Sequence, residues 1–249
     1  MRTPRIVRRC SQTLAFVLFV SILWSTTYPL HGIISAAILF QLDPLIMSLT
    51  ALSQRVLLPA LVLSLVILLL FVVFGRFFCG WCCPLGALID AVAAMRRRFP
   101  LLSDQQNLRL IRPKYLVLTL LVAAAGLGVQ LAWIADPVVI MARFVSLIMI
   151  PGVTASADSL FAWLIQTFGW YGAVYDLYRQ LKMSLLGVKS SVFAHTVFIL
   201  ATVLLSAGAA LFIPRFWCRA CCPLGALYAV FARHPWFRRS VSSCSRCMR

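Results

Sequence analysis

Four long apolar stretches divide the chain, and most of its polar residues lie between them or at its ends. The stretches cover residues 11–30, 56–74, 115–135 and 192–213. Each has about the 20 apolar residues that an α-helix needs to cross the hydrocarbon core of a bilayer. The pattern therefore predicts an all-α integral membrane protein with four transmembrane helices.

The four predicted helices fall into two similar halves. Each half consists of an apolar stretch, an Asp-Pro pair, a second apolar stretch and a cysteine-rich segment. Both halves cross the membrane in the same sense, so we expect two tandem parallel helix-hairpin repeats related by an axis along the membrane normal. We place the first repeat at 1–95, a basic linker at 96–114, the second repeat at 115–233 and a further segment at 234–249.

The Asp-Pro pairs are Asp43-Pro44 and Asp136-Pro137. Asp caps the free N–H groups of a helix, and Pro fits the first helical turn, so this order is typical of a helix start. We expect a short surface helix after each pair, with the Asp as its cap. The functional alternative for these Asp residues is a proton acceptor near a quinol site.

The second half carries an insertion at about residues 150–190. It contains an apolar stripe at helical spacing and several aromatic residues, which together predict outer interfacial helices anchored in the membrane surface. A surface for docking a partner protein is the alternative. The stripe consists of Leu160, Phe161, Leu164, Ile165 and Phe168.

Composition and charge agree with a membrane location. Hydrophobic residues make up 62% of the chain and charged residues 12%, and 23 Lys and Arg against six Asp give a net charge of +17. Four of the basic residues precede the first stretch, seven lie between the second and third, and seven follow the fourth, against five on the opposite side. The positive-inside rule then predicts a multi-pass protein of a bacterial-type inner membrane, with both termini and both cysteine segments in the cytoplasm. Because the charges flank apolar stretches, we expect membrane lipid and no nucleic acid as a partner.

The two cysteine-rich segments are copies of each other. Residues 76–88 read RFFCGWCCPLGAL and residues 215–227 read RFWCRACCPLGAL, so ten of thirteen positions are identical. Cytoplasmic thiols stay reduced, and clusters of them bind soft metals or iron–sulfur clusters. A Pro after the last Cys is also found in ferredoxin cluster loops.

A four-iron cluster needs four thiolates, and each segment offers three. The simplest symmetric set takes two from each copy, and a tetrahedral zinc site could use the same four. The third Cys of each copy is then spare or serves a second site. The proposed ligands are Cys79, Cys83, Cys218 and Cys222, and the additional cysteines are Cys82 and Cys221.

The end of the chain contains another cysteine pair, Cys244 and Cys247, spaced as Cys-x2-Cys. This spacing begins a ferredoxin motif. We therefore expect residues 234–249 to start a ferredoxin-like domain that continues beyond this sequence, with these two cysteines as cofactor ligands. His31 and His195 do not occupy equivalent positions in the two halves, and we do not expect haem.

Residues 78–88 and 217–227 resemble the paired Cys-x3-Cys-Pro motifs of the NapH/NosR/CcoG-type membrane iron–sulfur proteins. The resemblance implies several membrane spans, 4Fe–4S clusters, a following ferredoxin-like domain and a role in electron transport. It also implies a quinone or quinol and another redox protein as partners. Within the family, Cys79, Cys83, Cys218 and Cys222 match the motif cysteines.

The sequence therefore predicts an electron-transfer subunit of an oxidoreductase system. It would pass electrons between the quinone pool or cytoplasmic donors and a partner reductase or maturation system. The alternative is a non-redox zinc- or copper-binding membrane assembly factor, because soft thiolate ligands bind these metals equally well.

Overall fold

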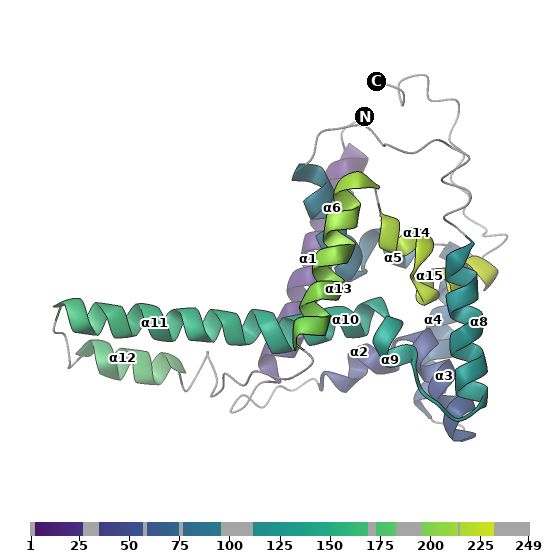
Figure 1. Ribbon diagram of the computed structural model, residues 1–249, viewed down its shortest axis with the longest axis horizontal. Helices are drawn as coiled ribbons and strands as arrows, with labels where there is room; N and C mark the ends of the chain where they lie inside the picture. Colours follow the sequence, from purple (N-terminus) through teal and green to yellow (C-terminus); the bar gives the residue numbers. More distant parts are fainter. Residues whose placement is uncertain are drawn as a thin grey trace.

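Helices make up all the regular structure in the part of the chain that the computed structural model describes, which confirms the all-α prediction (Figure 1). The described residues are 3–26, 35–56, 59–74, 77–95, 112–168, 173–182, 196–213 and 215–231. The helices are α1 (Thr3–Ser25), α2 (Ala37–Gln41), α3 (Pro44–Gln54), α4 (Ala60–Phe74), α5 (Phe77–Trp81), α6 (Pro84–Met95), α8 (Pro113–Gly126), α9 (Ala132–Ala135), α10 (Pro137–Phe144), the π-helical turn η1 (Val145–Met149), α11 (Ile150–Phe168), α12 (Ala173–Leu181), α13 (Thr196–Phe212), α14 (Phe216–Ala220) and α15 (Pro223–Phe231).

The order of helices in the first half recurs in the second. The elements α1 to α6 correspond in order to α8, α9, α10, α13, α14 and α15. The contacts between the halves are matched as well. Helix α6 packs on α13 as α15 packs on α4, and α6 contacts α10 as α15 contacts α3. Equivalent helices of the two halves therefore make equivalent contacts across the interface between the halves.

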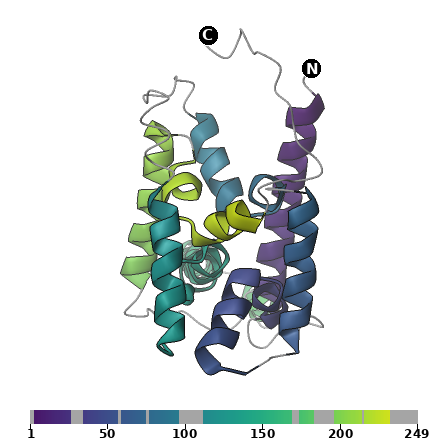
Figure 2. The same cartoon turned by 90° about the vertical axis from the view of Figure 1, so that its right-hand side faces the viewer.

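Helices α1, α4, α8 and α13 stand upright in the bundle (Figures 1 and 2). Two stretches, Ile6–Ser25 and Pro137–Thr167, are long and apolar enough to cross a membrane. The described parts of α4, α8 and α13 are apolar but shorter. At a rise of 1.5 Å per residue, the 17 residues of α13 extend about 25 Å, slightly less than a hydrocarbon core of about 30 Å.

The third apolar stretch is shorter as a helix than the sequence predicted. Helix α8 ends at Gly126, and Gly128 has a φ of +86°, a left-handed conformation that favours glycine. The N–H of Val129 donates to the carbonyl of Ala124 at 2.9 Å and closes the turn. The expected continuous helix over 115–135 is therefore wrong, because a Gly-Leu-Gly sequence interrupts it and the chain resumes as α9.

The helices after the Asp-Pro pairs are buried, so the expected surface location is wrong. In α3, residues from Pro44 to Met47 are buried, and in α10 all residues from Pro137 to Ala142 are buried. Both helices begin inside the interface between the halves, next to α15 and α6 respectively. Their largely apolar composition explains this, since these faces pack in the core.

Helix α10 continues through η1 into α11, and this long run lies across the upright helices. Figure 1 shows α11 projecting sideways from the bundle, and in Figure 2 the same run is seen end-on. Helix α12 packs alongside α11, with the rings of Phe161 and Tyr178 4.6 Å apart between centroids and Lys182 bound to Asp158 at 2.9 Å. The described part of the insertion therefore consists of two packed helices, and its exposed Trp163 is suited to a membrane surface.

Two apolar cores hold the bundle together, and each draws residues from both halves. The first contains Phe19, Ile89 and Met141, and the second contains Leu45, Leu121 and Tyr228. Outside these cores the upright helices expose large apolar side chains, such as Leu205 with 73% of its surface accessible. Soluble proteins rarely show such extended apolar faces, which is consistent with a lipid environment.

Candidate functional site

In the first cysteine segment, Cys79 lies within one helix and Cys83 lies just before the next. Helix α5 carries Cys79, the chain turns at Cys82, and α6 begins at Pro84. The N–H of Ala87 donates to the carbonyl of Cys83 at 3.0 Å, so Cys83 stands at the N-terminal end of α6. Pro fits the first turn because its missing N–H would have no partner there. The Cys83 thiol consequently lies at the positive end of a helix dipole.

The second segment repeats this construction. Helix α14 carries Cys218, and α15 begins at Pro223. The N–H of Ala226 donates to the carbonyl of Cys222 at 3.1 Å, and the N–H of Cys222 donates to the carbonyl of Trp217 at 2.9 Å. Cys222 therefore has the same position at the start of α15 that Cys83 has at the start of α6.

The fold brings four thiols together across the two halves. Cys83 is 6% exposed and packs in one core with the half-buried Cys218. Cys222 is 3% exposed and packs in the other core with the half-buried Cys79. Burial raises the pKa of both Cys83 and Cys222, and the charges of Cys79 and Cys218 raise it further. The four sequence-predicted thiols thus lie near enough for their charges to interact.

The other two motif cysteines lie outside this group. Cys82 is exposed and Cys221 is half-buried. Burial alone raises the pKa of each thiol, with no contribution from another cysteine. The segments therefore separate four inner thiols, Cys79, Cys83, Cys218 and Cys222, from two outer ones.

Two glycines leave room beside the inner thiols. A Cβ added to Gly86 would lie 3.0 Å from the carbonyl oxygen of Cys79, and one added to Gly225 would lie 3.4 Å from that of Cys218. The N–H of Gly225 donates to Sγ of Cys222 at 3.3 Å, and the backbone N–H of Gly86 is near enough to the Cys83 thiol to offset part of the rise of its pKa. Backbone N–H groups aimed at sulfur stabilise thiolates and tune the reduction potential of iron–sulfur clusters.

The inner thiols do not form a site for a single ion. Among the residues that the structure describes, no three Cys, His, Asp or Glu side chains lie close enough to hold one metal ion. A zinc site requires its sulfurs to converge at about 2.3 Å from one centre. A multinuclear cluster keeps its thiolate ligands apart by its own width. The donor set, the burial and the N–H bonds to sulfur fit such a cluster.

A network of polar side chains supports the first cysteine segment, and sequence reasoning missed it. Asp90 on α6 accepts hydrogen bonds from Gln12 at 2.8 Å and from Arg215, and it also pairs with Arg8. Gln12 donates in addition to the carbonyl of Gly80 at 3.0 Å, inside the segment. The available signal was that acidic residues are rare in the chain and that Asp90 stands two residues after the first cysteine segment, 76–88.

Asp43 and Asp136 meet at the centre of the interface between the halves. Each caps its helix as predicted, since Asp43 accepts from the N–H of Leu45 at 2.9 Å and Asp136 from that of Val138 at 2.7 Å. Asp43 is 4% exposed and Asp136 is 0% exposed, and their carboxyl groups lie within hydrogen-bonding reach of each other. Burial raises the pKa of both carboxyl groups. Two carboxylates so close cannot both be ionised without cost, so the pair holds a proton more readily than an exposed Asp.

Several predicted residues lie outside the described part of the chain. These are Cys244 and Cys247 of the C-terminal pair and His31 and His195.

Comparison with known proteins points to iron–sulfur chemistry. A family described as "4Fe-4S binding domain" matches twice, at residues 56–101 and 195–243, and each match includes one cysteine segment. The ferredoxin-type protein NapH of Escherichia coli (strain K12) is 34% identical over 180 residues, which is 68% of this chain and 61% of that protein. NapH of Haemophilus influenzae is 31% identical over 172 residues, covering 66% of this chain and 60% of that protein.

More distant similarity extends along nearly the whole chain. The uncharacterized protein MJ0750 of Methanocaldococcus jannaschii is 25% identical over 250 residues, which is 98% of this chain and 79% of that protein. The chain covers about three fifths of the length of each of the two NapH proteins. No solved structure matches it significantly.

Proposed function

The chain belongs to the NapH-type polyferredoxin family of 4Fe–4S proteins, and we propose that it is a membrane electron-transfer protein whose two halves hold a 4Fe–4S cluster between them. A bound cluster of this type supplies one-electron transfer. The chain's own residues bind it, exclude water from it and set the charge around it.

The packing of inner thiols from both halves into shared cores supports this proposal. A four-iron cluster needs four thiolates, and each half contributes only two thiols that face the other half. We assign Cys79, Cys83, Cys218 and Cys222 as the ligands. In this assignment neither half binds the cluster alone, and cluster binding joins them. Cys82 and Cys221 are then spare, or serve a second cofactor together with the C-terminal pair.

The surroundings of the inner thiols favour an anionic cofactor. Cys83 and Cys222 lie at helix N-termini. Burial raises the pKa of the Cys218 thiol, and the nearby charge of Arg215 offsets part of that rise. Burial otherwise keeps these thiols protonated, so loading the cluster must release their protons. The fixed positive charge of Arg215 and the glycine N–H groups then offset the negative charge of the ligated cluster.

We further propose that the cluster lies near the cytoplasmic face of a bilayer. The exposed apolar surfaces of α4, α8 and α13 support a membrane location. The cysteine segments both follow upright helices, α4 and α13, that run in the same direction (Figure 1). The excess of Lys and Arg around these segments supports a cytoplasmic location for them, because the positive-inside rule associates such an excess with the cytoplasmic side. In this reading α11 and α12 form the outer interfacial hairpin.

The proposed role is transfer of electrons between the quinone pool or a cytoplasmic donor and a partner redox protein. Two relatives carry the name ferredoxin-type protein, which supports the electron-transfer part. Oxidation of one quinol releases two electrons and two protons, so a single cluster would take the electrons in two successive steps.

A redox titration of the anaerobically purified full chain tests this function. We expect a visible absorption band that bleaches reversibly at one midpoint potential, and bleaching when a short-chain quinol or a reduced ferredoxin is added. Stoichiometric zinc or copper without sulfide would instead support the non-redox assembly role. A cluster that cannot be reduced by any donor would also contradict the proposal.

A further inference from the structure

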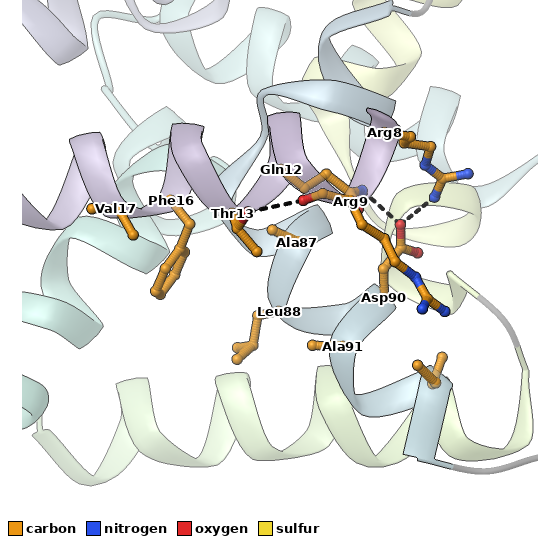
Figure 3. A pocket seen from close by; sticks show the side chains of 12 residues that line it. Arg8, Arg9, Gln12, Thr13, Phe16, Val17, Ala87, Leu88, Asp90 and Ala91 are labelled. Carbon is orange, nitrogen blue, oxygen red and sulfur yellow. Dashed lines mark hydrogen bonds and ion pairs between the residues drawn. The ribbon is translucent and has the colours of Figure 1, made fainter. Parts of the chain in front are cut away.

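A cavity of about 650 Å³ lies between α1 and α6, beside the first cysteine segment (Figure 3). This volume is within the range of sites for small organic ligands. Nothing in the electron-transfer proposal uses it. The lining is polar at one end and apolar along the rest, so each end favours a different part of a ligand.

The polar end has one carboxylate, and that carboxylate is already fully engaged. Both oxygens of Asp90 accept hydrogen bonds from Arg215, and Oδ2 also accepts from Gln12 and pairs with Arg8. Burial by itself raises the pKa of Asp90, but these bonds lower it to about 2. Asp90 therefore stays ionised and is unsuited to take a proton from a ligand.

Arg9 is the group at this end that remains available. Figure 3 shows its side chain extending from α1 toward α6, close to Asp90, with no line joining its guanidinium to another side chain. Arg8 and Arg215 share the single negative charge of Asp90, which is the one carboxylate among the residues that line this cavity. The charge of Arg9 therefore favours an anionic ligand at this end.

The rest of the cavity is apolar. Phe16 and Val17 line it from α1, and Leu88 and several alanines line it from α6. Arg9 stands near the start of Ile6–Ser25, one of the two described stretches long enough to span a bilayer. Arg residues at that position lie at the depth of lipid phosphates. The cavity thus combines a cation at headgroup depth with an apolar channel leading into the hydrocarbon.

We propose that this cavity binds one anionic phospholipid, with its phosphate against Arg9 and an acyl chain along Phe16, Val17 and Leu88. The bound lipid would brace α1 against α6. The position of α1 matters for the cofactor, because Gln12 on α1 donates to the carbonyl of Gly80 in α5 and Ser11 donates to that of Trp81 at 3.4 Å. The inference rests on the proposed membrane location and does not depend on electron transfer.

Native mass spectrometry of the full chain tests the inference. The delipidated protein would be incubated with phosphatidylglycerol or with phosphatidylcholine of the same acyl chains, and retained lipid counted. We expect retention of one phosphatidylglycerol, reduced about fivefold in Arg9→Gln, since an Arg at the membrane surface contributes roughly a factor of five to binding an anionic lipid. Arg143→Gln is the matched control, because Arg143 is exposed on α10 outside the cavity lining.

A second variant tests the apolar channel without changing charge. Ala91→Phe places a ring in the cavity, and we expect it to lose the retained lipid while keeping the wild-type iron content. Equal retention of both lipids, or full retention in Arg9→Gln, would overturn the proposal. Retention of a quinone that Ala91→Phe abolishes and Arg9→Gln leaves unchanged would assign the cavity to quinone instead. Iron content is measured on the same samples. If the protein retains the lipid but contains no iron, the cluster assignment is contradicted and the lipid site is not.

Discussion

Asp90 and Arg215 join the two halves of the molecule beside the inner thiols. They lie 125 positions apart, and the guanidinium donates from Nε to Oδ1 at 2.8 Å and from Nη2 to Oδ2 at 2.5 Å. Arg215 has a left-handed φ of +58° immediately before α14, the helix that carries Cys218. The ion pair therefore holds a strained residue in place and keeps its positive charge near the proposed ligands.

Replacing Asp90 by Asn should weaken this junction. The two arginines would lose their shared charge, and a hydrogen bond to a charged group contributes roughly 1.5–3 kcal/mol when it is protected from water, so we expect about 1–2 kcal/mol of destabilisation at this half-buried site. Unfolding of wild type and variant in the same detergent measures the difference. Asp176→Asn on α12, where the carboxylate is exposed, should leave the stability unchanged.

The ion pair of Asp90 and Arg215 also predicts that the protein loses stability in acid. The bonds from Arg215, Gln12 and Arg8 outweigh burial and lower the pKa of Asp90 from 3.8 to about 2. The unfolded chain then binds more protons than the folded one between these values. The stabilisation is complete above pH 3.8 and is lost as the pH falls toward 2. Asp90→Asn should remove this part of the acid sensitivity, and an unchanged acid transition in the variant would contradict it.

Gly86 and Gly225 occupy equivalent positions but should tolerate Ala differently. An added methyl group at Gly86 would lie 3.0 Å from the Cys79 carbonyl, a backbone atom that cannot move freely, whereas at Gly225 the corresponding distance is 3.4 Å. Overpacking of this kind costs about 1–3 kcal/mol, so Gly86→Ala should lower the iron content more than Gly225→Ala.

Iron and sulfide analysis of the two glycine variants measures this difference. Gly152→Ala provides the control, because a Cβ at Gly152 meets nothing within 4 Å. Equal iron loss in Gly86→Ala and Gly225→Ala would show that space beside the thiols does not limit cluster binding.

Asp43 should make the protein less stable as the pH rises. Burial raises its pKa from 3.8 to about 6, so the folded state binds more protons than the unfolded state over that interval. Stability should be highest near pH 4 and fall as the pH passes 6, with Asp136 contributing in the same direction. Unfolding midpoints between pH 4 and 8 test this, and a stability that rises through this window would contradict the paired-carboxyl interpretation.

Substitutions at Asp43 separate its charge from its capping bond. Asn keeps a capping oxygen and removes the charge, so Asp43→Asn should flatten the pH dependence and stabilise the protein at pH 8. Asp43→Ala loses the bond to Leu45 and should cost about 1 kcal/mol relative to Asn. If Asp43→Ala and Asp43→Asn have the same stability, the capping bond contributes little to it.

The apolar pattern and the repeat predicted much of this arrangement. Apolar stretches locate α1, α4, α8 and α13, because backbone groups in an apolar environment must bond within a helix. The duplicated cysteine segments indicated that the same positions of each copy would meet. The capping roles of Asp43 and Asp136 also followed from local chemistry, since Asp before Pro starts a helix wherever it lies.

Tertiary contacts account for what the sequence did not predict. Burial of α3 and α10 depends on which helices the other half presents to them, and no local pattern contains that information. The pairing of Asp90 with Arg215 joins residues from different halves and has no counterpart at the equivalent position, Ala229. The motif spacing did separate Cys83 from Cys82 as the proposed ligand, but the difference in burial between them depends on the turn between α5 and α6.

In the proposed protein, thiols from both halves bind one cluster. Iron and acid-labile sulfide analysis, with EPR of the anaerobic, dithionite-reduced protein, tests this on single Ala variants of the motif cysteines. We expect Cys83→Ala and Cys222→Ala each to lose the cluster signal, while Cys82→Ala and Cys221→Ala keep it. A signal that survives both Cys83→Ala and Cys222→Ala, or zinc or copper without sulfide in the wild type, would contradict the account.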